Sequence, residues 1–557
     1  MKPVRRPLLL TKGKVITLDG ESSICEALAI EGNRIVAVGR LDDVRSVAGP
    51  DCDEIDVQGR AVIPGLIDTH AHMDREGLKS IGPSLAGCRT IDDVLQRIEI
   101  AARQAEPGEW IVTMPVGEPP FYWDGPAGLR EQRLPNRREL DRVSPRNPVY
   151  IRPIWGYWRH APKPECIVSA ANSLALAATG LTAATPFPSG TVEPEIDPET
   201  GDLLGIFAEK SGIPIVELIM LSDASRFSEE QRRNGLVRAM SVYNSLATTG
   251  TYEGHGVSSD VFRAYRACHR SPGLSVRVRM THSPSWGTIG DGDPAAVVSQ
   301  WAYWASGLGD PFLSLNGLYV DHRWGPDDLV RARAAPYTGW AGYHYDSSLP
   351  KEKIKSVLLA AAKNDIQCVA LSSDLIGLLG EVDREVSLVG RRWIIQHFGP
   401  LTQAQCETAA RLGLVLTPLS IRYIYKEGRD PDAPGIDDFM PLARLASMGV
   451  PVTFASDNAP PSLFHCIWHA VARRDRFGRA VAPAHEKLSR EQALRSATIN
   501  GAYLTFEENE RGTLEPGKLA DLAVLSDDPL TCPEETLPDI RSMLTLVDGR
   551  VVHRDGL

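Results

Sequence analysis

The sequence predicts an α/β protein: a (β/α)8, TIM-type barrel with a small β-sandwich domain formed by both termini and a large insertion after the first barrel strand. Between residues 62 and 457, short apolar runs such as 276–280 and 393–398 alternate with stretches whose apolar residues recur at helical spacing. Strands and helices that alternate in this way indicate parallel βα units. Eight such strands can be counted in this part of the chain, which favours a closed barrel over an open, doubly wound sheet.

The two ends of the chain have a different pattern. Short segments that alternate apolar with polar residues and stop at Gly, Asp or Asn fill both ends. Similar strands at both termini predict one small sheet domain assembled from them. We therefore expect residues 1–61 and 507–557 to form the β-sandwich, and residues 62–506 to form the barrel. Residues 107–235 are rich in Pro, Gly and Trp and interrupt the βα rhythm, so we expect an insertion there that covers the barrel mouth.

The composition narrows the classes of partner and compartment. The chain has 557 residues and a formal net charge of −11, which argues against nucleic acid or an anionic membrane surface as its main partner. Its nine cysteines include no CxxC pair, as expected for buried thiols in a reducing compartment. The basic N-terminus lacks the apolar run of a secretory signal, and no segment approaches the length of a membrane span. These features predict a cytoplasmic protein of the size of an enzyme.

Four polar residues end predicted barrel strands, where the active sites of such barrels lie. His70 and His72 end the run VIPGLIDTHAH, and residues i and i+2 of a strand point to the same side, so both imidazoles can reach one ion. His397 ends WIIQHF, and Asp457 ends VPVTFASD, where a carboxylate can bind a metal or accept a proton from water. Each has a plainer explanation, namely histidines hydrogen-bonded at strand ends and a helix N-cap. Their occurrence at three strand ends of one barrel favours a shared site.

Longer motifs carry a family resemblance. The runs VIPGLIDTHAHMD and FASDNAP, with ATINGAYLTF and RGTLEPGKLADLAVLSDDP near the C-terminus, resemble those of the amidohydrolase superfamily in its YtcJ-like branch, also called amidohydrolase family 3. The resemblance covers almost the whole chain. It implies a metal-bearing barrel, a β-sandwich built from both ends, and hydrolysis of amide or other non-peptide C–N bonds of small molecules. It also implies a homodimer and a divalent metal, which we expect to be zinc, held by His70, His72, His397 and Asp457.

Two positions depart from the family pattern. The family commonly has a lysine on barrel strand 4, which can be carboxylated to bridge two metals, and Gly317 occupies that place. A histidine usually ends strand 5, where this chain has Ser372. We therefore expect one bound ion and not two. The candidates to replace the missing ligands or to contact substrate are Glu209, Glu253, His255, His282, His322 and Ser372, although hydrogen bonding around a loop-rich mouth is the plainer role for each.

The resemblance and these residues together predict a metal-dependent hydrolase in which a metal-activated water attacks the substrate. Asp457 would accept the proton of that water and pass it to the leaving nitrogen, and His397 would complete the coordination or hydrogen-bond the oxyanion. Trp155, Trp158 and Trp324 would line a pocket for an aromatic substrate, unless they only pack the core.

Two other functions stay open at this point. The first is a mononuclear-metal deaminase, which typically uses a strand 5 histidine as a ligand, so that Ser372 counts against it. The second is a catalytically inactive barrel that acts as a binding protein. Gly317 and Ser372 favour this second alternative, whereas the presence of all four predicted ligands counts against it.

Overall fold

The computed structural model describes most of the chain, in two units. The described residues are 6–122, 125–154, 166–210, 214–221, 224, 226–301, 305–322, 339–344, 346–428 and 435–557. Three residues of the predicted aromatic pocket, Trp155, Trp158 and Trp324, lie outside them. The first unit comprises Met1–Met73, Leu236–Arg323 and Ser347–Leu557, and the second comprises Asp74–Gly235 and Trp324–Asp346.

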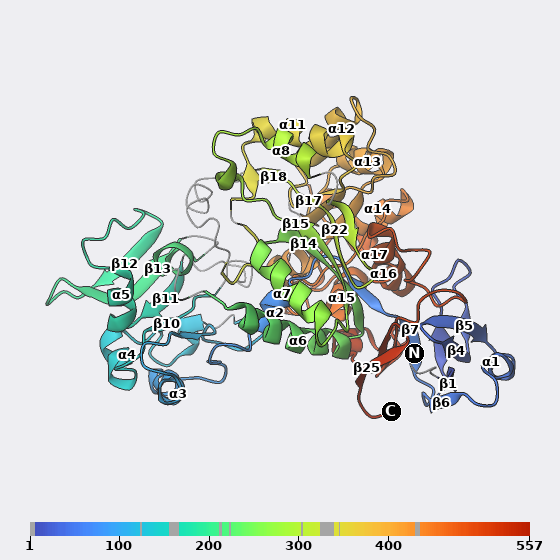
Figure 1. Ribbon diagram of the computed structural model, residues 1–557, viewed down its shortest axis with the longest axis horizontal. Helices are drawn as coiled ribbons and strands as arrows, with labels where there is room; N and C mark the ends of the chain where they lie inside the picture. The colour runs from blue at the N-terminus through green and yellow to red at the C-terminus, as the bar shows by residue number, and fades with distance from the viewer. Residues whose placement is uncertain are drawn as a thin grey trace. The chain divides into compact units, whose positions relative to one another are not determined.

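A parallel sheet forms the centre of the first unit (Figure 1). Neighbouring strands are parallel throughout the order β8–β14–β15–β17–β20–β21–β22. The strands span Leu66–Asp68 (β8), Thr248–Val257 (β14), Arg277–His282 (β15), Leu313–Tyr319 (β17), Cys368–Ala370 (β20), Ile394–Phe398 (β21) and Val415–Pro418 (β22).

An eighth extended segment, residues 450–457, joins the two ends of this sheet. On one side Val452 forms a parallel bridge with Leu416 of β22, and Thr453 N donates to Leu416 O at 2.9 Å. On the other side Thr69 N, just after β8, donates to Phe454 O at 3.1 Å. Hydrogen bonds on both edges close the circle, which confirms the predicted TIM-type barrel.

Helices follow the strands and cover the sheet (Figure 1). In α7 (Ser259–Arg270) the buried residues Val261, Ala264, Tyr265 and Cys268 recur at helical spacing, so one face packs on the barrel. Helix α13 (Gln403–Leu412) begins with a capping box at Thr402 and ends at Gly413, whose φ of 66° only glycine adopts without strain. The other helices of this layer are α6 (Glu229–Ser245), α8 (Pro294–Gln300), α11 (Lys351–Lys363), α12 (Leu375–Asp383), α14 (Leu442–Ser447), α15 (Leu463–Ala472), α16 (Arg490–Ser496) and α17 (Ile499–Leu504).

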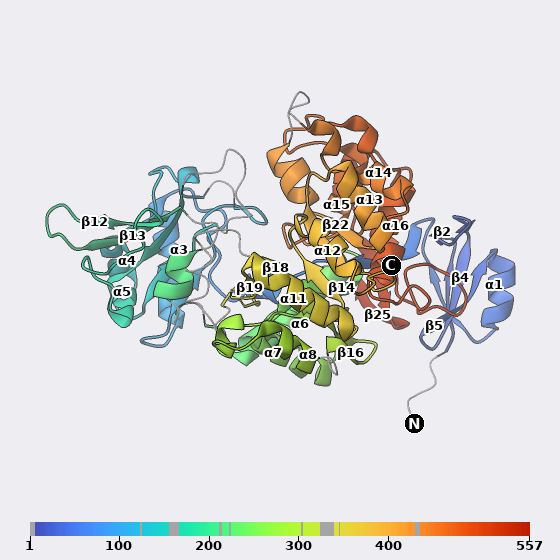
Figure 2. The ribbon, with the colours of Figure 1, turned by 90° about the horizontal axis from the view of Figure 1, so that it is seen from above.

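The predicted β-sandwich also belongs to the first unit, and both termini contribute to it. One sheet has the order β5 (Arg34–Gly39), β4 (Ala27–Glu31), β1 (Leu8–Thr11), β6 (Asp53–Asp56). The other has the order β25 (Arg550–Arg554), β24 (Ser542–Val547), β23 (Leu522–Leu525), β7 (Ala61–Pro64), β2 (Lys14–Ile16), β3 (Ile24–Cys25). Both inner faces share one apolar cluster, and α1 (Leu41–Ala48) packs on β4 outside it (Figure 2).

The chain passes from the sandwich to the barrel at Gly65. The sequence suggests one buried strand through this region, but β7 pairs with β2 and β23 of the sandwich, whereas β8 pairs with β14 of the barrel. A Cβ on Gly65 would lie 2.2 Å from the side chain of Thr249. Only glycine therefore allows the two sheets to join here.

The second unit has its own sheet and its own core. Its strand order is β12 (Val192–Ile196), β13 (Leu203–Glu209), β11 (Ile167–Ala171), β10 (Val149–Ile151), β9 (Ile111–Thr113), with α3 (Ile91–Gln104), α4 (Arg137–Val143) and α5 (Ser173–Thr179) beside it. Helix α3 belongs to this unit although it precedes the predicted insertion at 107–235. The predicted role of the insertion as a cover for the barrel mouth stays a prediction.

Buried ion pairs tie the barrel to the C-terminal segment. Arg277, at the amino end of β15, donates from Nε to Asp521 Oδ2 at 2.7 Å and from Nη2 to Asp548 Oδ1 at 3.1 Å. Glu507 accepts from Arg511 Nη2 at 2.7 Å and from Arg279. Burial raises the pKa of Glu507, but the charges of Arg511 and Arg279 outweigh it and lower the pKa to about 2.

We expect Glu507→Gln to lower the free energy of unfolding at neutral pH by on the order of 3 kcal/mol, since one pKa unit corresponds to about 1.4 kcal/mol. A carboxyl whose pKa falls on folding stabilises the fold above its ordinary pKa of 4.5 and loses that contribution as the pH falls toward about 2. The deficit of the variant should therefore shrink with falling pH. Thermal unfolding followed by circular dichroism at a series of pH values measures it.

Glu510→Gln is the matched control, because Glu510 pairs with Arg34 at the surface, where the two side chains are 50% and 44% exposed. Exposed pairs of this kind contribute about 0–1 kcal/mol. A deficit that is the same for both variants, or that does not change with pH, would contradict the assignment.

Candidate metal centre

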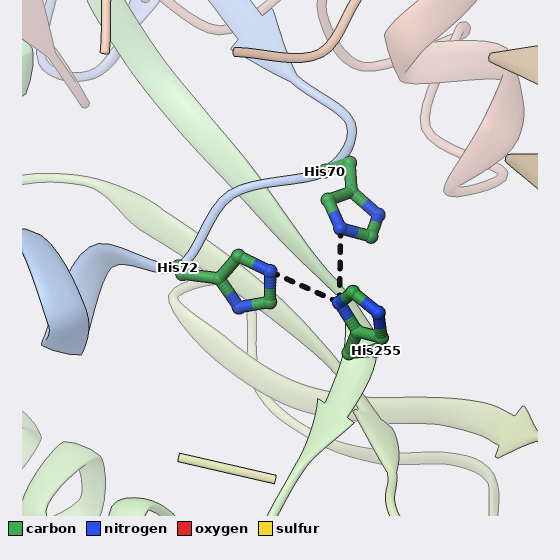
Figure 3. A group of neighbouring side chains, drawn as sticks. All are labelled: His70, His72 and His255. Atoms are coloured by element: carbon green, nitrogen blue, oxygen red, sulfur yellow. Dashed lines mark hydrogen bonds between the residues drawn. The ribbon is translucent and has the colours of Figure 1, made fainter. Parts of the chain in front are cut away.

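Imidazoles from three barrel strands converge at the carboxyl ends of the strands. His70 and His72 follow β8, His255 lies within β14, and all three are buried. Figure 3 shows the rings of His70 and His72 directed toward His255. His397, in β21, and Asp457, at the end of the eighth segment, lie beside the same cluster. The four ligands that the resemblance implies are thus neighbours, and His255 joins them.

The distances within the cluster are short. His255 Nδ1 lies 3.1 Å from His70 Nε2 and 3.1 Å from His72 Nε2. Asp457 Oδ1 lies 3.4 Å from His72 Nε2, and its Oδ2 lies 3.9 Å from His397 Nε2. Two overlapping groups of potential ligand atoms, those of His70, His72 and His255 and those of His70, His397 and Asp457, each fall within 4.8 Å of one another.

Two glycines allow His255 to reach this position. A Cβ on Gly254 would lie 2.4 Å from His70 Nδ1 and 2.2 Å from the side-chain oxygen of Gln396. Gly256 has a φ of +75°, and a Cβ there would lie 2.6 Å from Ser283 N. Any other residue at either place would push β14 away from its neighbours.

Backbone strain also builds the site. His397 has a φ of 58°, and Asp457 and Asn458 have φ values of 48° and 58°. Non-glycine residues in this left-handed region cost on the order of 1 kcal/mol or more, and such residues cluster at functional sites. The register between β21 and β22 shifts between Gln396 and Phe398, so His397 sits in a β-bulge.

Hydrogen bonds beneath the cluster hold the ends of β8 and the eighth segment together. Asp68 accepts from His70 N at 3.2 Å and from Ser456 N at 3.1 Å. Burial raises the pKa of Asp68 to about 6, although these hydrogen bonds oppose the rise. Asn458 Oδ1 accepts from His72 N at 3.2 Å and from Tyr243 OH at 2.7 Å. The backbone that carries both histidines is therefore fixed on each side.

The carboxyl of Asp457 is held in its ionised form. Burial raises its pKa, but the hydrogen bond to His72 and the positive charge of His397, His70 and His72 outweigh that effect. The pKa of Asp457 consequently lies well below its ordinary range. At neutral pH this carboxylate can accept a proton or bind a cation.

The other predicted candidates have separate partners. Glu253 borders the cluster: its Oε1 accepts from Met73 N at 3.0 Å and from Tyr265 OH, and its Oε2 lies 3.9 Å from His72 Nδ1. Glu209, on β13 of the second unit, accepts from Val216 N at 3.0 Å. His282 ends β15 and packs edge-on against Trp301, with ring centroids 4.8 Å apart.

The ends of strands 4 and 5 carry a separate polar pair. His322, in β18 (Asp321–His322), lies with its Nε2 3.3 Å from Ser372 Oγ. Next to it, Asp321 accepts from Tyr319 OH at 3.2 Å and from Leu371 N at 3.0 Å, and burial raises its pKa to about 6. The ring of Tyr319 in turn faces that of His255, at 5.7 Å between centroids. Among the described residues, the clusters of His, Cys, Asp and Glu with metal-ligand spacing do not include His322.

The backbone at Gly317 leaves no room for a side chain. Its φ is +109°, and a Cβ there would lie 2.5 Å from Gln367 O. No ligand can therefore come from residue 317 with β17 in this conformation, and the match of this residue to the lysine of the family stays a prediction.

From the sequence, His255 is predicted only as one of several substitute ligands, and Gln396 is not predicted at all. The spacing of neighbouring residues in the sequence does not indicate that residues 70 and 255 are in contact, because they lie on different strands. The flanking glycines in EGHGV were the available signal, because glycine inside a strand often marks a close approach of neighbouring groups.

A closed parallel barrel with imidazoles and a carboxylate gathered at the carboxyl ends of its strands defines a metal-dependent hydrolase. The sequence profile of the amidohydrolase family matches residues 53–553, and the chain belongs to this family. This membership confirms the predicted family and the predicted class of enzyme, a metal-dependent hydrolase that acts on carbon–nitrogen bonds.

Full-length relatives and solved structures agree with this assignment. The chain is 26% identical to the N-substituted formamide deformylase of Arthrobacter pascens over 98% of each chain. It is 23% identical to the putative amidohydrolase YtcJ of Bacillus subtilis over 97% of this chain and 98% of that one.

An uncharacterised metal-dependent hydrolase from Pyrococcus furiosus has the same fold, with a TM-score of 0.66 at 18% identity, over 94% of this chain and all of that one. The zinc complex of atrazine chlorohydrolase TrzN from Arthrobacter aurescens aligns with a TM-score of 0.52 at 16% identity, over 98% and 95% of the chains. No helix in the described part of the chain is long and apolar enough to cross a membrane.

Proposed function

We propose that the protein hydrolyses the amide bond of a small N-acyl compound, with an N-substituted formamide as the first candidate. The observation that carries the proposal is the convergence of three ring nitrogens. His70 Nε2 and His72 Nε2 each lie 3.1 Å from His255 Nδ1. Similarity to a formamide deformylase along the whole chain supports the choice of substrate.

The donor set fits a zinc ion. Two zinc–nitrogen bonds of about 2.0–2.1 Å at a tetrahedral angle place their nitrogens roughly 3.3 Å apart, close to the observed separations. Three imidazoles with a carboxylate, Asp457, beside them are the donor types that zinc prefers, and a catalytic zinc keeps one position for water. The loss of strand 4 and strand 5 ligands at Gly317 and Ser372 supports one ion and not two. A divalent ion at this place would supply Lewis acidity, which lowers the pKa of a coordinated water and polarises a carbonyl.

The side chains of this chain would then carry out the proton transfers. Asp457, ionised at neutral pH, accepts the proton of the attacking water and passes it to the leaving nitrogen. His397 Nε2 lies 3.9 Å from Asp457 Oδ2, whereas His72 Nε2 approaches Oδ1, and His397 can hydrogen-bond the developing oxyanion or complete the coordination. The His322–Ser372 pair, at the rim of strands 4 and 5, contributes hydrogen-bonding groups to substrate.

The proposal keeps two further expectations from the sequence. The compartment is the cytoplasm, and the assembly is a homodimer. Size-exclusion chromatography with light scattering tests the homodimer directly. A monomer at working concentration would contradict the second expectation.

Purified protein loaded with zinc should release formate and an amine from N-substituted formamides. A panel that varies the nitrogen substituent between aryl and alkyl groups also tests whether the pocket prefers aromatic substrates. Removing the metal with a chelator should abolish the activity, and adding zinc back should restore it. Release of ammonia from an exocyclic amine without cleavage of any amide would favour the deaminase instead.

Metal analysis should find about one ion per chain, and His255→Asn should lose most of it, because that variant removes the shared nitrogen of the cluster. His282→Asn is the control, since His282 packs against Trp301 and should keep the metal. Two ions per chain in the wild type, or equal metal content in both variants, would contradict the mononuclear site.

Asp457→Asn should keep the metal, which the imidazoles of His70, His72 and His255 still hold, and lose roughly 10²- to 10⁴-fold in turnover, because the amide cannot accept the proton of water. Asp310→Asn, at the surface pair with His269, should retain wild-type activity. Full activity of Asp457→Asn would show that another group is the base.

A further inference from the structure

One hydrogen-bonded amide lies behind the metal cluster and contacts one of its histidines. The side chain of Gln396 is fully buried, and its Nε2 donates to Thr69 O at 2.7 Å. Its Oε1 faces His70 Nδ1 in a short hydrogen bond. A backbone carbonyl can only accept, so Thr69 O fixes which end of the amide is the nitrogen. The oxygen must therefore face His70.

This orientation determines which ring nitrogen of His70 carries the proton. An amide oxygen is only an acceptor, so the hydrogen bond requires a proton on His70 Nδ1. In the neutral ring, Nε2 then presents its lone pair. That atom faces His255 Nδ1 at 3.1 Å and Asp457 Oδ1 at 3.9 Å, which is the side where a metal would bind.

We propose that Gln396 is a positioning residue that holds His70 in the Nδ1–H tautomer, so that the lone pair of Nε2 is directed toward the metal site. The inference rests on the proposed metal site. In this role Gln396 does not contact the substrate. It determines the tautomer of one metal ligand, His70.

Two independent features of the fold are needed to build this contact. Consecutive residues of a regular strand point to opposite faces, yet both Gln396 and His397 reach His70, whose ring centroid lies 4.2 Å from that of His397. The bulge at His397, with its φ of 58°, makes this possible. On the other side, Gly254 leaves the space that a Cβ would take within 2.4 Å of both hydrogen-bonded atoms.

Loss of the acceptor would free His70 to adopt the other tautomer and to rotate. Removing the hydrogen-bond partner of a metal-ligating histidine typically costs about 10- to 100-fold in metal affinity. Gln396→Met removes the acceptor at similar volume. Gln396→Glu restores an acceptor for Nδ1–H but gives up the donation to Thr69 O, so it separates the role of the acceptor from packing.

The test measures the affinity of metal-free full-length protein for zinc alone, in competition with a chelating dye. Gln396→Met should bind zinc about 10- to 100-fold more weakly than the wild type, and Gln396→Glu should recover most of that loss. Gln367→Met is the control, because Gln367 is also a buried glutamine that donates to backbone carbonyls, those of Arg392 and Leu504. It should bind zinc as the wild type does.

A second measurement determines the tautomer in the wild type itself and needs a variant, His70→Asn, only to assign the signal. Spectra of protein labelled with 15N-histidine should show a protonated Nδ1 and an unprotonated Nε2 in His70. Protonation of Nε2 instead would overturn the inference.

The outcomes distinguish this inference from the function on which it rests. Wild-type zinc affinity in Gln396→Met, or equal losses in Gln396→Met and Gln396→Glu, would overturn the role of Gln396 and leave the metal site in place. A wild type that binds no zinc would overturn both.

Discussion

The contact between His70 and His255 requires the ends of β8 and β14 to approach so closely that residue 254 has no room for a Cβ. The rest of the cluster depends on this approach. His255 brings its Nδ1 to 3.1 Å from both strand 1 histidines, and the same gap admits the oxygen of Gln396 behind His70. A larger residue at 254 would disrupt both the imidazole cluster and the hydrogen bond between His70 and Gln396. The two features therefore depend on the same close approach.

Electrostatics assigns different roles to the groups that this approach assembles. Burial raises the pKa of Asp457, but its hydrogen bond to His72 and its attraction to the imidazoles of His397 and His70 outweigh the burial, so Asp457 stays ionised at neutral pH. Asp68, only two residues before His70, has the opposite environment: burial raises its pKa to about 6, and its oxygens are occupied by Ser456 and the His70 amide. Two carboxylates within one site thus differ in pKa because one faces imidazoles and the other faces backbone and hydroxyl groups.

Local pattern was enough to predict the barrel, the sandwich from both termini and the strand ends that carry His70, His72, His397 and Asp457, because strand and helix periods are properties of neighbouring residues. The role of His255 could not be predicted in this way, since residues 70 and 255 meet only through pairing of β8 with β14. Gln396 was missed for a different reason. Strand alternation places it on the face opposite His397, and only the bulge at His397 brings both to the same ring.

The sequence predicts that two family ligands are missing from strands 4 and 5, and the geometry of strand 4 bears on one of these predicted losses. Gly317 cannot carry any side chain without striking Gln367 O, so this position of strand 4 is closed to a ligand by its backbone and not by one substitution. In the proposed site His255, on strand 2, takes the place of the imidazole that strand 5 would have contributed. An ion there would be held by groups on strands 1, 2 and 8, with His397 on strand 6 beside them. His322 and Ser372, hydrogen-bonded to each other at the ends of strands 4 and 5, would then be left as polar groups for substrate. Such a division of the mouth would leave strands 4 and 5 to recognise the substituent of the amide.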